Sequence, residues 1–276
     1  PEPVTLWTEE GAGVLVLARA SGSFAFDHQT LQGNNAQSTR GARIDGFTIK
    51  SADTGGGIIA NGYARYLDLS NNRIANNTGT YAGGIRIGHP FLTDPDELSY
   101  VDGENDFVSI HNNQVVFNGG LDGAGGGISM CTGADSYAIE SNWVCGNFSI
   151  GNGGGIGHIG VSARVPGQGN QPAGDLPLIA GNTVIFNENF FQAQTVSGGG
   201  LYIGGAPPLT PGGLTTGAGD LNVFGNLFQG NSAVAGDGGG ISLAGVNGQD
   251  VANNPTNFER NLGAVELGAD NKDFFV

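Results

Sequence analysis

Short runs in which apolar and polar residues alternate recur along the chain, and Asn or Gly bounds each of them. Four clear cases are YLDLS, FVSIH, YAIES and GIRIG. Alternation with a period of two, carried by β-branched and aromatic residues, predicts β-strands. Helical spacing is not seen over any window of about 11 residues. The pattern therefore predicts an all-β protein made of short strands.

The strands belong to a repeated unit, which contains two Asn residues separated by four others and then a triplet of small residues followed by an aliphatic one. The triplet and its aliphatic residue occupy 55–58, 82–85, 125–128, 153–156, 198–201 and 238–241. The Asn pairs are Asn72/Asn77, Asn113/Asn118, Asn142/Asn147, Asn182/Asn187 and Asn226/Asn231. Two residues after the first Asn stands an apolar residue: Ile74, Val115, Val144, Val184 or Phe228. This column predicts a shared core.

Weaker copies flank these units. Upstream, RIDGFTIKSADTGGGII has Gly46 where the first turn Asn is expected. Downstream, TNFERNLGAVEL has Phe258 in the apolar column, Asn261 at the second Asn and 263–265 at the glycine corner. An uninterrupted unit has about 28 residues, since Ile128 and Ile156 are 28 residues apart. Longer gaps hold insertions at 88–106, 157–176 and 204–220, always after the aliphatic residue.

Three strands and three turns in each unit, without a two-residue hairpin signal between units, indicate a coil that stacks parallel strands about 4.8 Å apart. We predict a single-stranded right-handed parallel β-helix of six to seven coils, with the three insertions on one side. The first Asn of each pair should tolerate a left-handed turn and form a ladder. The ladder residues are Asn72, Asn113, Asn142, Asn182 and Asn226. Glycine triplets should supply positive φ and let neighbouring coils approach closely.

We expect one domain. Residues 1–40 are predicted to form a strand that leads into the helix and a capping segment, 41–268 the repeats, and 269–276 a C-terminal tail. The start at Pro1 and the apolar end DFFV indicate a piece of a larger protein.

Several of these motifs together resemble a known group of proteins. They are IDGFTI at 44–49, the NxVxxN units, the FxxN steps at 228–231 and 258–261, and the GG[AG]I corners. Across roughly 41–268 they are similar to right-handed β-helix repeat proteins of the pectin-lyase-like superfamily and to the repeats of bacterial polymorphic outer-membrane and autotransporter adhesins. The resemblance implies export, surface display or polysaccharide binding, and in other relatives lyase or hydrolase chemistry.

Composition narrows the choice of partners. The net charge of −15 disfavours a nucleic acid or an anionic membrane surface, and no apolar run reaches the length of a membrane span. The 52 glycines among 276 residues, about 19%, far exceed the usual ~7%. This excess fits the glycine triplets at the corners of the repeats. A phosphate loop is disfavoured because the glycines precede strands, and the chain has only Lys50 and Lys272. A calcium roll is disfavoured because Asp lies before the glycines.

Candidate chemistry lies in and beside the first insertion. If the chain is an enzyme, the resemblance to lyases of this fold implies catalytic roles for Arg86, His89, Asp94 and Asp96. Those lyases use a basic residue, Arg or Lys, beside a calcium ion that carboxylates bind. The oxygen ligands Asp94, Asp96, Glu97 and Asp102 suit Ca²⁺, but a solvated polar loop is the preferred interpretation because no EF-hand spacing is met. No cofactor is predicted, and calcium is the one candidate. The Asp motifs typical of polygalacturonases are missing.

For the other residues of functional types, structural interpretations are preferred. Arg65, Arg73 and Arg86 are expected to face outward and pair with acids. Cys131 and Cys145 are about half a coil apart, which favours two buried free thiols over a disulfide. Trp143 should face outward, under an insertion or as a platform for sugar stacking. His111 and His158 do not share a column, which disfavours a stacked-His metal site.

The preferred function is a noncatalytic, exported or surface β-helix scaffold or adhesin segment that binds protein or glycan. The insertions leave the helix at one corner, so they should form a wall that serves as the interaction surface. The alternatives are a polysaccharide lyase or glycoside hydrolase, and a structural segment of a larger secreted multidomain enzyme. Other domains of the same precursor are further candidate partners.

Overall fold

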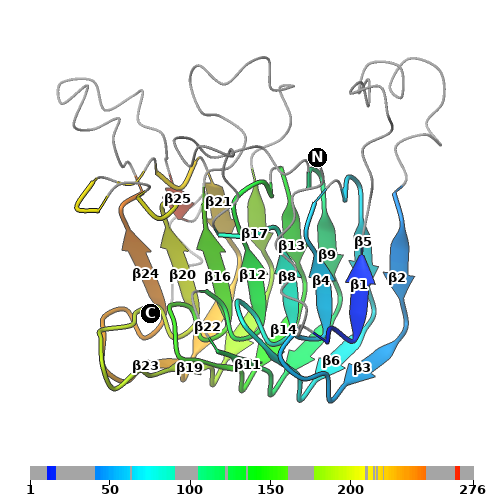
Figure 1. Cartoon of the computed structure of the whole chain (residues 1–276), viewed down its shortest axis with the longest axis horizontal. Helices are drawn as coiled ribbons and strands as arrows, with labels where there is room; N and C mark the ends of the chain where they lie inside the picture. Colours follow the sequence, from blue (N-terminus) through cyan, green and yellow to red (C-terminus); the bar gives the residue numbers. More distant parts are fainter. Residues whose placement is uncertain are drawn as a thin grey trace.

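The computed structural model describes residues 11–16, 41–62, 64–90, 105–121, 124–134, 136–160, 177–208, 211–213, 215, 217–219, 221–246 and 265–267. Within these ranges there is no helix, and the strands form four sheets whose neighbouring strands all run parallel (Figure 1). Nothing in the described part of the chain has the form of a membrane-crossing helix.

We number the sheets in the order in which one repeat visits them. Sheet I contains β2 (Arg43–Asp45), β5 (Asp68–Ser70), β9 (Ser109–His111), β13 (Ala138–Glu140), β17 (Leu178–Ala180), β21 (Leu221–Phe224) and β25 (Val265–Leu267). Sheet II contains β3 (Thr48–Lys50), β6 (Arg73–Ala75), β10 (Gln114–Val116), β14 (Trp143–Cys145), β18 (Thr183–Ile185) and β22 (Leu227–Gln229).

The other two sheets complete each turn of the chain. Sheet III contains β7 (Thr78–Gly79), β11 (Gly119–Gly120), β15 (Phe148–Ser149), β19 (Glu188–Asn189) and β23 (Ser232–Ala233). Sheet IV contains β1 (Val14–Val16), β4 (Ile58–Ala60), β8 (Ile85–Ile87), β12 (Ile128–Met130), β16 (Ile156–Ile159), β20 (Leu201–Gly204) and β24 (Ile241–Ala244).

Consecutive strands of each sheet come from consecutive repeats, so the chain rises by one rung per repeat, as in a parallel β-helix. In Figure 1 the strands of sheet IV lie side by side along the long axis, from β1 at the right to β24 at the left. The prediction of three strands per unit is wrong, because complete repeats contain four. Sheet III was missed because its strands have only two residues, too few to show alternation.

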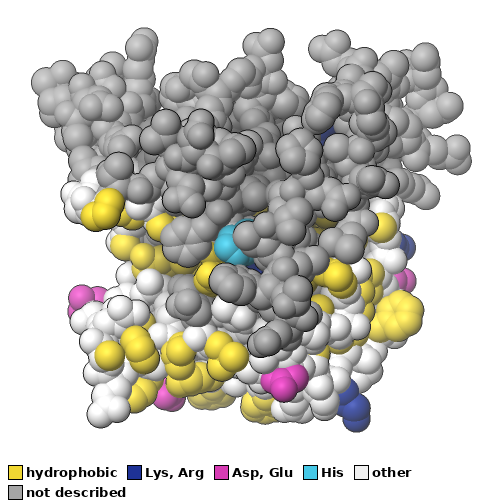
Figure 2. All heavy atoms as spheres, viewed as in Figure 1, with side chains coloured by type: hydrophobic (Ala, Val, Ile, Leu, Met, Phe, Trp, Pro, Cys, Tyr) yellow, Lys and Arg dark blue, Asp and Glu magenta, His cyan; other side chains and the backbone are white. Residues whose placement is uncertain are grey.

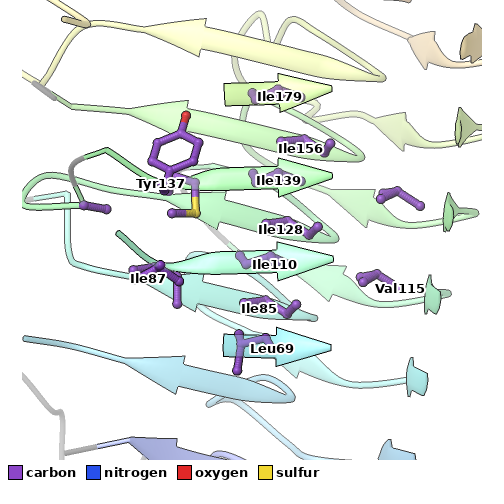
Figure 3. Close-up of a cluster of buried hydrophobic side chains, with 14 of the residues drawn as sticks. Leu69, Ile85, Ile87, Ile110, Val115, Ile128, Tyr137, Ile139, Ile156 and Ile179 are labelled. Carbon is purple, nitrogen blue, oxygen red and sulfur yellow. The ribbon is translucent and has the colours of Figure 1, made fainter. Parts of the chain in front are cut away.

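The interior of the coil is filled by aliphatic columns that run from rung to rung. On sheet IV, Ile85, Ile128 and Ile156 are in register, and they face the column Ile110, Ile139 and Ile179 of sheet I (Figure 3). All of these side chains are fully buried, which contributes about 1.5–3 kcal/mol each. The predicted column of sheet II is confirmed: Ile74, Val115, Val144 and Val184 are fully buried, and Phe228 packs against the core.

The predicted asparagine ladder is confirmed, and it lies at the bend between sheets I and II. Asn142 is typical: its amide Nδ2 donates to Ile110 O at 2.8 Å and to Asn182 Oδ1 at 3.0 Å. Its Oδ1 accepts from the backbone N of Asn113 at 2.9 Å and from Asn113 Nδ2 at 3.0 Å. The Asn142 side chain therefore satisfies a backbone carbonyl and a backbone N–H of the preceding rung, and it bonds to the ladder side chains of both neighbouring rungs.

The expected cause of this ladder was partly wrong. The residue before each ladder Asn has positive φ, as at Asn71 (φ 54) and Asn112 (φ 55), so the ladder residue itself does not make the left-handed turn. For the same reason Gly46 (φ 78) aligns with Asn71 and not with the ladder residue. Phe47 stands at the ladder position, and its backbone N donates to Asn72 Oδ1 at 3.0 Å.

A second asparagine ladder lies at the bend between sheets II and III. It is formed by Asn77, Asn118, Asn147, Asn187 and Asn231, with Nδ2 to Oδ1 distances of 2.9–3.0 Å between successive members. These are the second Asn residues of the repeated pairs, which the sequence marked without revealing that they form a ladder of their own. The constant separation of four residues between the two Asn of each pair was the signal that could have revealed this second ladder.

The glycine triplets do what was predicted of them. A positive φ occurs at the first glycine of several triplets, for instance Gly153 (φ 75) and Gly198 (φ 74). The third glycine packs against the next rung and the second ladder: a Cβ on Gly155 would lie 2.6 Å from Gly200 O and 2.9 Å from Asn187 Nδ2. The corner thus requires glycine for close approach as well as for conformation.

The two ends of the described stack extend different sheets. β1 adds a strand to sheet IV, with Val14 opposite Ile58, so the helix begins within the range 1–40. The capping segment predicted there and the tail 269–276 lie outside the described residues. β25 pairs with β21 in sheet I, with Val265 opposite Leu221. The prediction that 263–265 is a glycine corner is therefore wrong, because a corner would lead into sheet IV. Phe258 and Asn261 lie outside the described residues.

The three predicted insertions fall between strands of sheet IV and strands of sheet I: β8 and β9, β16 and β17, and β20 and β21. β16 continues to Ile159 and β20 to Gly204, so these strands take in the first residues of the ranges 157–176 and 204–220. Most of 88–106 and of 157–176 lies outside the described residues, so the common wall of the three insertions stays a prediction.

Candidate functional site

The outer side of sheet IV holds polar side chains that are buried. Alternation along β8 and β12 turns Arg86 and Ser129 away from the aliphatic core, in register with each other, and Cys131 follows on the same side as Ser129. All three are at most 2% exposed. Burial of an arginine on the outer side of a sheet is unusual, because charged side chains are almost never fully buried unless paired.

Arg86 and His89, the residues predicted to act if the chain is an enzyme, are brought together around Tyr81. The guanidinium carbon of Arg86 lies 5.7 Å from the centre of the Tyr81 ring. The His89 ring meets the same ring edge to face, with centroids 5.0 Å apart. Cation–π contact stabilises a desolvated arginine. Arg86 points to the outer side of its sheet, as predicted, but its side chain is buried beside Tyr81 and is not exposed.

The other two arginines differ in exposure, because the Arg65 side chain is only 15% exposed whereas Arg73 is exposed. Arg65 forms an ion pair with Asp106, 2.8 Å from Nη2 to Oδ2, as expected of an arginine next to the acidic insertion. Arg73 is exposed and reaches Gln114 Oε1 at 3.4 Å.

The predicted calcium ligands cannot be placed against this arrangement. Asp94, Asp96, Glu97 and Asp102 all lie outside the described residues. Among the residues that are described, no three His, Cys, Asp or Glu side chains come together in a way that would hold a metal ion. Calcium binding by the first insertion therefore stays an untested alternative to the solvated polar loop.

The two cysteines are free, as predicted, but they differ in exposure. Cys131 is buried beside Ser129, with 3.3 Å between Sγ and Oγ, whereas Cys145 is only half-buried. The prediction that both are buried is wrong for Cys145, because it lies on the outer side of β14. Burial raises the pKa of the Cys131 thiol to about 11, although the Ser129 hydrogen bond and the Arg86 charge oppose the rise.

We expect one thiol of the folded protein to react with Ellman's reagent at pH 8, since only a thiolate reacts and the Cys131 thiol is both buried and protonated there. The second thiol should react after unfolding in urea. Cys145→Ser should abolish the reaction of the folded protein, and Cys131→Ser should leave it intact. Fast labelling of two thiols in the folded state would contradict the burial of Cys131.

His158 lies inside the coil at a position that is apolar in neighbouring rungs, opposite Met130 and Ile203. Its Nδ1 is 2.9 Å from the Tyr137 hydroxyl, and its Nε2 is 2.7 Å from Ala218 O and 3.2 Å from Gly160 O. Burial lowers the pKa of His158, and the backbone hydrogen bonds to Ala218 and Gly160 oppose this. As predicted, it shares no column with His111, which lies on sheet I.

We expect His158 to make the protein less stable as the pH falls below about 6.5, the ordinary His value. The unfolded chain then binds a proton at His158 that the folded chain does not, so protonation favours unfolding. The double variant His158→Met/Tyr137→Phe should lose less free energy of unfolding between pH 7.5 and pH 5, measured by urea titration. Parallel pH profiles of the two proteins would exclude this role.

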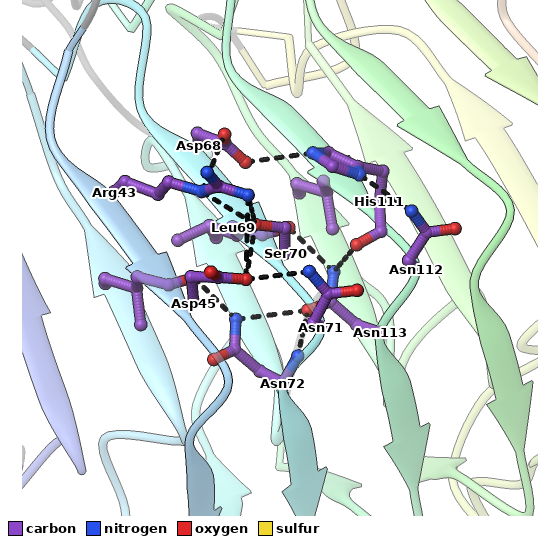
Figure 4. A network of polar contacts seen from close by, with 12 residues as sticks. Arg43, Asp45, Asp68, Leu69, Ser70, Asn71, Asn72, His111, Asn112 and Asn113 are labelled. Atoms are coloured by element: carbon purple, nitrogen blue, oxygen red, sulfur yellow. Dashed lines mark hydrogen bonds and ion pairs between the residues drawn. The ribbon is translucent and has the colours of Figure 1, made fainter.

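An outward polar network covers the start of sheet I (Figure 4). His111 Nε2 lies 3.0 Å from Asp68 Oδ1, and Arg43 Nε lies 3.2 Å from Asp68 Oδ2. Hydrogen bonds from Asn71 and Ser70 lower the pKa of Asp45 at the edge of the network. Ser70 bonds to Arg43 and Asp45, so these side chains do not form the serine–histidine–acid relay of a hydrolase. The network consists of partly exposed ion pairs and hydrogen bonds between rungs.

Sheets II and III carry an exposed apolar surface, which we call the II–III face. It consists of Phe117, Leu121, Trp143, Phe148, Phe186, Phe190, Leu227 and Val234, each at least 38% exposed. Trp143 thus faces outward as predicted. In Figure 2 apolar side chains gather along the lower edge of the molecule, where Figure 1 draws β11, β19 and β23. Apart from Trp143, the sequence analysis missed this surface because its residues come from different repeats.

The II–III face is also nearly free of charge. Among the described outward positions of sheets II and III on the four rungs from Gln114 to Val234, Glu188 is the only charged side chain. A contiguous exposed apolar surface on a soluble protein usually marks an interaction site. Comparison of the chain with protein-family models, with curated proteins and with solved structures finds no match.

Proposed function

We propose that this chain is a noncatalytic binding scaffold of an exported or cell-surface protein, and that it binds a glycan or protein along its flank. The observation that carries the proposal is the II–III face, an exposed and almost uncharged apolar surface that spans four rungs. Its rings lie on the strands of sheets II and III or directly after them, and two asparagine ladders tie these rungs together. A rigid platform loses little entropy on binding.

The finer fold assignment supports this function. We take the coil to be right-handed, because crossovers between parallel strands are right-handed in about 98% of cases. With the motifs described above, this favours the pectin-lyase-like superfamily and the adhesin repeats that resemble it. Six to seven coils with three lateral insertions give an elongated rod that presents two different flanks. The insertions 88–106, 157–176 and 204–220 are a second candidate surface, and deletion of 88–106 should weaken binding if they contribute.

The second candidate function is polysaccharide cleavage by a lyase or hydrolase, or a structural role in a larger secreted enzyme. The observation in its favour is the convergence of Arg86 and His89 on Tyr81. Acid–base chemistry would also need carboxylates within reach of these groups. Asp94 and Asp96 are the candidates for that role.

One experiment separates the two functions. The purified chain is applied to arrays of plant, microbial and animal glycans and of extracellular matrix proteins, and every glycan that binds is then assayed for new reducing ends and unsaturated products. We expect binding without cleavage. Cleavage that Arg86→Gln abolishes would replace the scaffold by the enzyme, and failure to bind any array component would overturn the scaffold proposal.

A further inference from the structure

We propose that the II–III face binds a neutral, extended β-1,4-linked polysaccharide that lies along the rod, with sugars stacked on Phe117 and Phe186. This inference rests on the proposed function and specifies its ligand. It follows from three properties of the face: the placement of the two rings, their spacing, and the near absence of charge.

The two rings occupy equivalent positions on alternate rungs. Phe117 and Phe186 both have positive φ, 58° and 54°, at the bend between sheets II and III. The intervening rung has Gly146 at this position, and the next rung after Phe186 has Gly230. A Cβ on Gly146 would lie 2.6 Å from Phe117 Cε1, and one on Gly230 would lie 2.6 Å from Phe186 Cδ1. Each ring therefore lies over the glycine of the following rung.

This seating fixes the rings while leaving them open to solvent. Both side chains are 60% exposed, the highest values among the large apolar residues described. An aromatic side chain that covers a glycine cannot move into the bend without meeting backbone, so its outer side stays available. Trp143 and Phe148 flank Gly146 on the intervening rung, and apolar surface therefore continues between the two rings.

The spacing selects the linkage. Two rungs at about 4.8 Å each place equivalent positions roughly 10 Å apart. In an extended β-1,4-linked chain every second sugar presents the same face, and its disaccharide repeat is close to this distance. Alternate sugars could therefore stack on Phe117 and Phe186 at once. An α-1,4-linked chain of the same sugar coils, so it cannot keep successive faces in register with a straight row of rings.

The charge selects a neutral sugar. Glu188 is the only charged residue at the described outward positions of sheets II and III on these four rungs, and the whole chain carries −15. A polyuronate would be repelled by the field of the protein and would find no basic partner on this face. Aromatic rings offer the apolar faces of neutral sugars a large contact area at little entropic cost.

The test compares three hexasaccharides by titration calorimetry: cellohexaose, maltohexaose with the α-linkage, and hexagalacturonate with negative charge. The variant is Phe117→Asn/Phe186→Asn, since Asn76 occupies the same bend with φ 54 on an earlier rung and the substitution suits the backbone. The control is Phe47→Asn, which removes a ring of 59% exposure from the other bend, at a ladder position where Asn is the usual residue.

We expect the native chain and Phe47→Asn to bind cellohexaose alike, and to bind the other two probes at least tenfold more weakly. Each removed ring should cost about tenfold in Kd, equivalent to about 1.4 kcal/mol. Urea midpoints verify that both variants are folded. If the double variant does not fold, Trp143 fluorescence in a Trp7→Phe background is the readout: cellohexaose should change it and maltohexaose should not.

Several results would overturn the inference. They are equal affinity for hexagalacturonate or maltohexaose, an equal loss of affinity in Phe47→Asn, no binding of cellohexaose, or a native dimer that the double variant converts to monomer in sedimentation. These leave the scaffold function standing if the arrays still bind the chain without cleavage. Cleavage of a probe would instead remove the scaffold function itself.

Discussion

Gly155→Ala should lower the free energy of unfolding by about 3 kcal/mol, whereas Gly240→Ala should leave it unchanged or raise it by up to about 1 kcal/mol. The two glycines occupy the same column, the third position of a triplet directly before a strand of sheet IV. They differ in what an added methyl group would meet, and Gly155 is buried whereas Gly240 is half-buried.

At Gly155 the new Cβ would lie 2.6 Å from Gly200 O and 2.9 Å from Asn187 Nδ2. Neither atom can move freely, because the backbone N of Ile156 donates to Gly200 O and Asn187 belongs to the second ladder. The rungs must separate or the ladder must break. At Gly240 no atom of the described residues lies within 4 Å of the added Cβ, so we expect the reduced entropy of the unfolded chain to dominate.

The test is the free energy of unfolding in urea, measured for both variants and for the parent protein. Equal free energies for Gly155→Ala and the parent would mean that the rungs adapt to a methyl group. The glycine triplets would then be needed for positive φ alone.

Asn142→Ala should destabilise the protein by about 4 kcal/mol, because two buried backbone groups lose their partners at about 1–3 kcal/mol each. The first is the backbone N–H of Asn113, which donates to Asn142 Oδ1 at 2.9 Å. The second is the carbonyl of Ile110, which accepts from Asn142 Nδ2 at 2.8 Å. Asn142 is only 2% exposed, so water does not replace the side chain.

Two variants control for the change of residue. Asn222→Ala removes a half-buried Asn from the outer side of β21 and should change stability by less than about 0.5 kcal/mol. Asn142→Asp keeps the volume and the accepting oxygen but loses the donating amide, so it should remain destabilised at neutral pH. A full recovery of stability in Asn142→Asp would show that the ladder needs only an acceptor.

Much of the fold could be predicted because each structural position recurs in several repeats of the sequence. The column of Ile74 and Val115 identified the core of sheet II, and the constant spacing of Asn72 and Asn77 marked two positions at turns. Local detail was less accessible. The left-handed residue is Asn71 and not Asn72, because side chains that bond across rungs and residues that turn the chain are neighbours of similar type.

The candidate sites were predictable to different degrees. Arg86 and His89 were singled out by their nearness in sequence, but their shared contact with Tyr81 depends on how the chain returns after β8. His158 gave no sign of being internal, since its neighbours in the column, Met130 and Ile203, are far away in sequence.

The sequence by itself determined the all-β parallel architecture, the aliphatic core and the use of Asn and Gly at the corners, because these are periodic and each copy reinforces the others. Only the tertiary structure decided that a fourth sheet closes each coil and that Phe117, Phe186 and Trp143 come together on one exposed face. The physical reason is that a β-helix converts a separation of tens of residues into a rise of about 4.8 Å per rung. Surfaces built across rungs have no local signature.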